Sequence, residues 1–227
     1  MIHQATNELF RYWNDLRGER TAPERNQVDP SAIRHVLADT FMLEFDAERR
    51  FPIRLAGTRV NALFDAEQKG RSFLDLWPSE ERRNLAGILM TVADGACPVV
   101  AGAVAAPAGR NACAFELLFL PMRHHGKTHS RILGMIKSVK NPSWLGMLPI
   151  GPLELRSLRI VDDDELDRVD AGPRAMPQGL AAKLLGAAAR TDGRPFLRVI
   201  DGGAAVRRET GRPRSNVFEV EVENCHL

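Results

Sequence analysis

The chain has 227 residues, of which 44% are hydrophobic and 26% are charged, and its formal net charge is +2. The apolar fraction is enough for a packed core, and so small a net charge argues against nucleic acid as the main partner. Three cysteines, Cys97, Cys113 and Cys225, are too few for a disulfide framework in a chain of this length. The first residues lack the basic and apolar runs of a signal peptide, and the most apolar stretch, 85–107, is interrupted by charged, glycine and proline residues. We therefore expect a cytoplasmic protein that binds neither nucleic acid nor a membrane.

The first 39 residues are expected to form a helical flank. Residues 5–17 place four apolar side chains on one helical stripe, and Gly18 follows as a stop signal. A second, short helix is expected from the Asp29-Pro30-Ser31 cap through Leu37. The stripe of the first helix consists of Leu9, Phe10, Trp13 and Leu16.

Strand-like alternation begins at Thr40. Phe41, Leu43 and Phe45 alternate with Met42, Glu44 and Asp46, which is typical of a half-buried strand, and a second strand at 51–55 completes a hairpin. The remaining expected elements are helical segments at 59–64, 72–77 and 79–92 and strands at 98–104, 112–121 and 130–139. This order indicates an α+β fold built on an antiparallel sheet.

The chain divides between residues 140 and 160, and the character of the sequence changes after about residue 160. We expect a core at 40–140, a connecting segment at 141–160 and a low-order tail at 161–227, where glycine, proline, alanine and arginine dominate. Two alternating segments of this tail, 196–200 and 217–222, are interpreted as isolated strands in an otherwise largely disordered region.

Two segments of the core carry a resemblance to a known family. Gly57-Thr-Arg-Val-Asn-Ala-Leu-Phe64 and Glu67-Gln-Lys-Gly-Arg-Ser-Phe-Leu-Asp75 resemble the central helical section of PAS domains. In element order the resemblance covers about residues 40–139. It implies a PAS-like five-stranded antiparallel sheet with short helices on one face, where a ligand or a packed core lies. The N-terminal helix and the run 54–59 resemble small stand-alone PAS proteins from alphaproteobacteria.

The resemblance identifies no cofactor. Flavin photosensors of the family carry a reactive cysteine in an Asn-Cys-Arg-Phe motif, whereas this chain has Asn61-Ala-Leu-Phe64, so flavin adduct chemistry is not expected. Haem members need a histidine on or near the connecting helix, and none occurs from Trp77 to Gly95. The cofactor and the ligand are therefore unknown from the sequence.

The candidates for a ligand pocket are two arginines and the aromatic side chains of the expected core. A guanidinium group can hold an anionic ligand through two parallel hydrogen bonds. The same groups can instead pair with Glu44, Asp65 or Asp75 and hold the helical section in place, which is the interpretation that we favour. Aromatic side chains at these spacings are more often plain core. The full set is Phe41, Phe45, Arg54, Arg59, Phe64, Phe73, Trp77, Phe115 and Phe119.

Three histidines form the most metal-like pattern. His124, His125 and His129 lie within a six-residue stretch, but a zinc site would need a fourth ligand and a fixed scaffold. They fall at an expected hairpin turn, where solvated polar residues are common. We favour the solvated turn and expect no metal.

These observations predict a PAS-type sensory or regulatory module without catalytic activity. We expect it to act through ligand-modulated contacts with an unidentified signalling partner. The alternative is a metal- or cofactor-binding protein or enzyme, with a site assembled around Arg54, Arg59 and the three histidines. Because a PAS sheet cannot bury both its own short helices and the stripe of residues 5–17 on its concave face, we expect that stripe to form the contact of a homodimer. The competing interpretation is that the stripe folds back on its own sheet.

Overall fold

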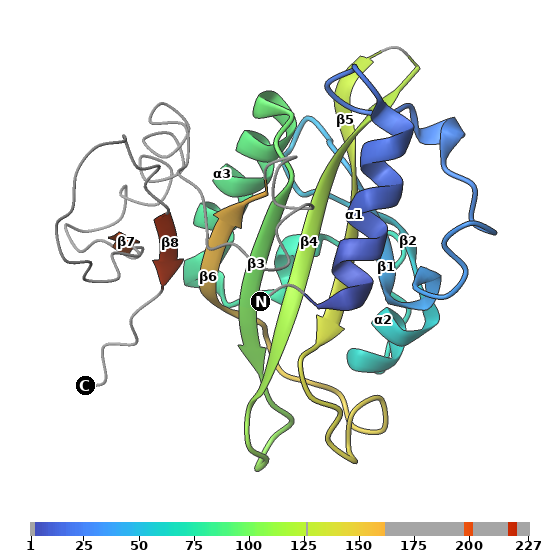
Figure 1. Cartoon of the computed structure of the whole chain (residues 1–227). Helices are drawn as coiled ribbons and strands as arrows, with labels where there is room; N and C mark the ends of the chain where they lie inside the picture. The colour runs from blue at the N-terminus through green and yellow to red at the C-terminus, as the bar shows by residue number, and fades with distance from the viewer. Residues whose placement is uncertain (1–2, 126, 162–197, 202–217, 222–227) are drawn as a thin grey trace, which may run out of the picture.

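The fold is one antiparallel sheet with helices on both faces (Figure 1). The computed structural model describes residues 3–125, 127–161, 198–201 and 218–221. In these residues the strand order is β2-β1-β5-β4-β3-β6-β8-β7. The strands are β1 Thr40–Glu44, β2 Ile53–Ala56, β3 Val99–Ala105, β4 Cys113–His124, β5 Lys127–Ser138, β6 Glu154–Ile160, β7 Arg198–Asp201 and β8 Phe218–Glu221. The helices are α1 Gln4–Arg17, α2 Thr58–Leu63 and α3 Ser79–Gly95, with 3-10 turns η1 Arg25–Gln27, η2 Leu37–Asp39 and η3 Phe73–Leu76.

The prediction of an α+β fold with a PAS-like antiparallel sheet and an N-terminal helix is confirmed. The five strands expected between residues 40 and 139 are present and lie side by side as β2-β1-β5-β4-β3. One strand was missed: β6, which pairs with β3 inside the expected connecting segment at 141–160. A register shift between Gly102 and Ala103 lets Leu155 and Leu158, three residues apart, both face the core. This bulge removes the period-2 signal by which a strand is recognised.

The inner face of the sheet carries the larger core. The helix α3 begins after Pro78 with two acidic residues in its first turn and ends at Gly95, and the following Ala96 has left-handed backbone angles. Its buried side chains, among them Leu85, Ile88 and Leu89, pack with those of α2 and η3 against the strands. The aromatic side chains of the core lie in this layer.

The outer face is covered by α1, which Figure 1 shows on the side of the sheet opposite α3. Leu9, Phe10 and Trp13 are almost fully buried there, and the Trp13 indole Nε1 donates a hydrogen bond of 2.9 Å to the Pro121 carbonyl of β4. The expectation that this stripe is an exposed dimer contact is therefore wrong, because the stripe packs on its own sheet; Leu16 is half-buried.

The burial of the outer face also corrects the expected pattern of the first strand. The side chain of Met42 faces outward on β1 and was expected to be exposed, but only 6% of it is accessible. The N-terminal segment supplies the cover: Ile33 and Val36 belong to the same outer cluster as Met42 and Trp13. Over β1, β4 and β5, the sheet is thus covered on both faces rather than half-exposed.

The helix expected from Asp29 to Leu37 is mostly a series of turns. The Asp29 carboxylate accepts hydrogen bonds from the backbone N–H and the hydroxyl of Ser31, an arrangement that stabilises a turn and lowers the pKa of Asp29. Only the last residues, Leu37–Asp39, form the 3-10 turn η2. The segment therefore lies along the sheet as a non-helical wall.

The segment after β5, residues 141–153, crosses the inner face before it enters β6, and we call it the strap. The amide of Ile150 donates to the Leu63 carbonyl of α2, and that of Leu153 donates to the Leu76 carbonyl of η3, both at 2.8 Å. Trp144 and Leu145 pack against the inner core. The strap thereby holds α2 and η3 against the inner face through backbone hydrogen bonds.

Of the expected tail, the structure places the short strands β7 and β8 near the two alternating segments; the rest of 162–227 lies outside the described residues.

Candidate ligand groove on the outer face

An open groove lies between the wall formed by residues 25–38 and the strands β1 and β2. Its volume is about 570 Å³, within the range of small-molecule sites. We call it the outer groove. Apolar side chains dominate its lining, among them Val28, Ile33 and Leu37 from the wall and Met42, Leu55 and Leu133 from the sheet.

A β-bulge gives the groove its apolar floor. Leu43 pairs with Ile53, whereas the next residue back, Met42, pairs with Leu55, so Arg54 has no opposite residue in the register. Ile53 therefore faces the inner core, and Leu55, two positions later, faces outward beside Met42. The side chain of Leu55 is 48% exposed and that of Leu37 is 38% exposed, so both present apolar surface at the opening.

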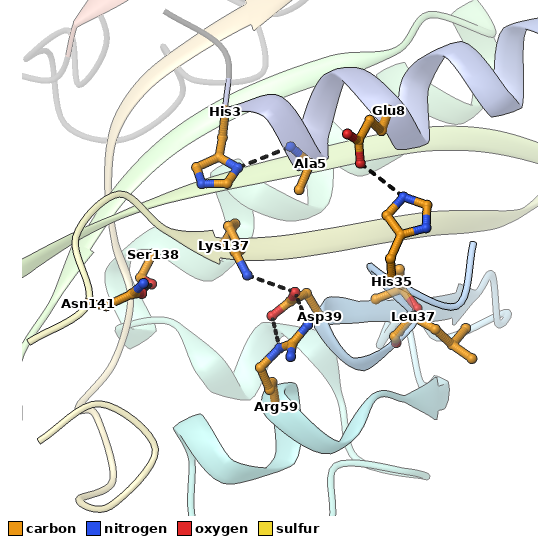
Figure 2. A network of polar contacts seen from close by, with 11 residues as sticks. His3, Ala5, Glu8, His35, Leu37, Asp39, Arg59, Lys137, Ser138 and Asn141 are labelled. Carbon is orange, nitrogen blue, oxygen red and sulfur yellow. Dashed lines mark hydrogen bonds and ion pairs between the residues drawn. The ribbon is translucent and has the colours of Figure 1, made fainter. Parts of the chain in front are cut away.

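The lower end of the wall is fixed by a buried carboxylate. Asp39 is only 4% exposed, and Figure 2 shows it between Arg59 of α2 and Lys137 of β5. Arg59 donates two hydrogen bonds of 2.7 Å to its two oxygens, and the Lys137 ammonium lies 2.9 Å from one of them. The hydrogen bonding by Asp39 raises the pKa of Arg59. Two cations thus share one carboxylate and tie the wall to both α2 and β5.

A glycine allows the wall to approach the sheet at the same end. A Cβ atom placed on Gly57 would lie 2.3 Å from the Ala38 carbonyl oxygen, which is backbone and cannot rotate away. Any side chain at position 57 would therefore push the wall from the sheet.

The outward side of the wall is joined to α1. The Tyr12 hydroxyl accepts a hydrogen bond of 2.7 Å from the Asp29 amide, and His35 lies 2.9 Å from Glu8. Figure 2 shows the His35–Glu8 contact beside the Asp39 cluster. The wall is therefore linked to α1 as well as to the sheet.

The charge around the groove is of one sign. Arg25 and Arg34 line it, whereas none of its lining residues is acidic. Both arginines are exposed, and neither guanidinium has a hydrogen-bond or ion-pair partner among the residues that the structure describes. The nearest acidic residues of the wall are engaged elsewhere: Glu24 pairs with Arg123, and Asp29 binds Ser31.

A family model described as PAS domain matches residues 1–137. The chain belongs to the PAS domain family. No curated protein and no solved structure matches it. As a PAS domain, the chain is in general terms a sensory or regulatory module.

The aromatic residues expected to line a pocket of this PAS domain lie in its inner core. Phe41, Phe73, Trp77, Phe115 and Phe119 are each at most 2% exposed, and Phe45 and Phe64 pack against them. The rings of Phe41 and Phe73 stack with centroids 5.0 Å apart. The aromatic side chains therefore contact one another in the inner core, on the face of the sheet opposite the outer groove. Phe41 is the one member of this set that also lines the groove.

The two candidate arginines are held in ion pairs at opposite ends of β1. Arg54 pairs with Glu44 at the end of the strand, as one of the expected pairings proposed, and Arg131 lies 2.9 Å from the same carboxylate. The pKa of Glu44 is lowered: burial raises it, and these arginines lower it by more. Arg59 pairs instead with Asp39, immediately before the strand begins.

The histidines lie at the hairpin between β4 and β5, as expected. The imidazoles of His124 and His125 are 4.0 Å apart between ring centres, while the side chain of His129 lies outside the described residues. Because Arg59 lies at the far end of β1, the structure does not bring it together with the histidines. In the described part of the chain, no three His, Cys, Asp or Glu side chains are grouped so as to hold a metal ion.

The residues that sequence reasoning missed are those of the groove itself. Ile33 and Leu37 were placed in the helix expected from Asp29 to Leu37, and Val28, just before that helix, was given no role. Leu55 was placed in the second strand, but nothing in its sequence marks the bulge that turns it away from the face of Ile53. The role of Asp39 left no signal, because its partners lie 20 and 98 residues away in the sequence.

Within the described ranges, no helix has the length and apolar character needed to cross a membrane.

Proposed function

We propose that this PAS domain is a regulatory module without catalytic activity, which binds a small apolar ligand in the outer groove and thereby alters its contacts with a signalling partner. The observation that carries the proposal is the groove of about 570 Å³ with its apolar floor and two partly exposed leucines. Mostly apolar clefts of this size with a few polar groups are typical of ligand sites.

The structure of the wall supports a regulatory role for such a ligand. The wall is built from turns rather than from a regular helix, and most of its backbone hydrogen bonds lie within the wall. Among the described residues, the backbone hydrogen bond that joins residues 25–38 to β1 or β2 is the one from the Thr40 amide to the Leu37 carbonyl, where the chain passes from the wall into the strand. The rest of the wall can therefore shift against these two strands without breaking a backbone hydrogen bond. Its contacts with α1, through Asp29 and His35, would transmit a displacement to the outer surface of the protein. A ligand that prefers one position of the wall would shift the population of surfaces that a partner meets.

The nature of the partner and the cellular place belong to the same proposal. We propose a cytoplasmic setting, as the composition suggests, and a second copy of the chain as one partner. Since Leu9, Phe10 and Trp13 are buried, that contact would use other residues than the stripe first considered. No feature of the described residues favours the enzyme alternative over this function.

The proposal is tested by thermal unfolding of the purified full chain with a panel of apolar metabolites. A ligand that binds only the native state raises the melting temperature. Leu55→Ser should weaken binding about tenfold, because it removes part of the apolar surface that the ligand covers. Val139→Ser is the matched control: Val139 is another exposed apolar residue beside a strand, 57% accessible, and does not line the outer groove.

Two results would overturn the proposal. One is a panel in which no compound raises the melting temperature. The other is a ligand whose affinity is the same for Leu55→Ser and for the unchanged chain, because it must then bind elsewhere.

A further inference from the structure

We infer that the ligand of the outer groove is an amphiphilic anion, with an apolar chain on the floor and a carboxylate or phosphate group held by Arg25 and Arg34. The inference rests on the proposed function, since it names the ligand class of the same groove. It commits to a soluble monomeric amphiphile rather than to a lipid surface or a protein helix.

The apolar part of the inference follows from the floor. Met42, Leu55 and Leu133 come from three adjacent strands and form a continuous apolar strip, because β2, β1 and β5 are neighbours in the sheet. Ile33 and Leu37 face this strip from the wall. An alkyl chain placed between them would remove apolar surface of both sides from water, which stabilises the complex in proportion to the area covered.

The charge of the ligand follows from the two arginines. Both line the groove, both are exposed, and neither has a partner among the described residues. This contrasts with Arg54 and Arg59, whose guanidinium groups are held by carboxylates. A guanidinium offers paired donors that match the oxygens of a carboxylate or a phosphate.

The same argument from charge complementarity excludes a cationic amphiphile, because no residue that lines the groove is acidic. The acidic side chains closest in sequence to Arg25 and Arg34 are Glu24, Asp29 and Asp39, and all three are occupied by other partners. A cation on the floor would therefore meet two like charges without a compensating carboxylate.

The experiment compares ligands that share one tail and differ in charge. Calorimetric titration of the full chain with decanoate, decanol and decyltrimethylammonium, each below its aggregation concentration, separates the tail from the headgroup. We expect decanoate to bind at least tenfold more tightly than decanol, the cation to bind more weakly than decanol, and acetate not to bind. Raising the salt concentration should reduce this preference, because exposed charges are screened.

The variants locate the headgroup. The double variant Arg25→Gln, Arg34→Gln should lose about tenfold in decanoate affinity and leave decanol affinity unchanged. Arg110→Gln removes a charge from an exposed turn that does not line the groove, and should bind decanoate as the unchanged chain does. Both changes are on the surface, so the fold should persist.

The outcomes separate this inference from the proposed function. Equal affinities for decanoate and decanol, unaffected by the double variant but weakened by Leu55→Ser, would overturn the anionic ligand and keep the groove as a site. If neither decanoate, decanol nor decyltrimethylammonium binds, the result overturns both the anionic ligand and the proposed ligand site in the groove. Binding to anionic vesicles or to an acidic amphipathic peptide without binding to monomeric decanoate would also overturn the inference, because the occupant would then be a surface or a helix.

Discussion

Replacing Trp13 with alanine tests whether α1 belongs to its own sheet or to a second copy. The indole is 1% exposed, packs with Phe10 at a centroid distance of 5.9 Å and donates its only N–H to Pro121. Truncation of a buried tryptophan to alanine destabilises a fold by about 3–5 kcal/mol. The lost hydrogen bond accounts for about 1 kcal/mol of that total. We expect a loss of about 4 kcal/mol, a large fraction of the stability of an ordinary domain.

The assay is urea unfolding followed by circular dichroism at two protein concentrations a hundredfold apart. With a slope of about 2 kcal/mol/M, the midpoint of Trp13→Ala should fall by about 2 M at both concentrations. Asp15→Ala is the matched control on the same helix: Asp15 is exposed, and its midpoint should stay within about 0.3 M of the unchanged chain.

One result would refute this reasoning. If Trp13→Ala keeps the original midpoint and merely converts a dimer into a folded monomer, then the stripe is an intermolecular contact. A midpoint of the unchanged chain that rises with protein concentration would point the same way, because the stability of an obligate dimer depends on concentration.

Three further predictions concern the anchors of the sheet and its wall. Asp39→Asn should destabilise the fold by about 3 kcal/mol in urea unfolding, since it leaves two cations without their buried carboxylate; an unchanged midpoint would contradict the anchoring role. Burial raises the pKa of Glu81, so the folded chain binds its proton more tightly and stability falls as pH rises from about 4.5 through the folded value. Glu81→Gln, whose amide oxygen can still accept from the β6 amide, should flatten this part of the pH–stability profile; a profile of unaltered slope would show that another group is responsible. Gly57→Ala should lower the urea midpoint by about 1 M and weaken ligand binding, because its Cβ displaces Ala38; equal values for both chains would show that the wall adapts at no cost.

The sequence predicted correctly those elements whose pattern is contained in a short stretch of neighbouring residues. The stripe of α1 and the alternation of Phe41 and Leu43 predicted a helix and a strand at the right places, because each pattern repeats with the period of its element. Gly18 follows α1 with a positive φ of 52°, as its role as a stop signal required.

The failures share one physical cause, which is that a bulge or a distant partner leaves no periodic trace. At Arg54 and at Gly102, an irregular register reverses the face on which the neighbouring side chains lie, so that Leu55 faces away from Ile53 and the strand β6 was missed. The cover over the outer face could not be read from α1 alone, since the same apolar stripe serves a dimer or a fold-back equally well. That choice depends on contacts between residues more than a hundred positions apart.

The long separation between α1 and its partners also bears on how the chain folds as it is made. Trp13 is synthesised 108 residues before Pro121, and Thr6 is made 110 residues before Glu116, the carboxylate to which its hydroxyl donates. At the pace of translation, about 5–20 residues per second, the apolar stripe leaves the ribosome roughly 5–20 s before β4 exists to receive it. A helix of 14 residues is only marginally stable alone in water. The helix α1 is therefore made well before it can dock, and through that interval its leucine, phenylalanine and tryptophan side chains are open to chaperones or to other nascent chains.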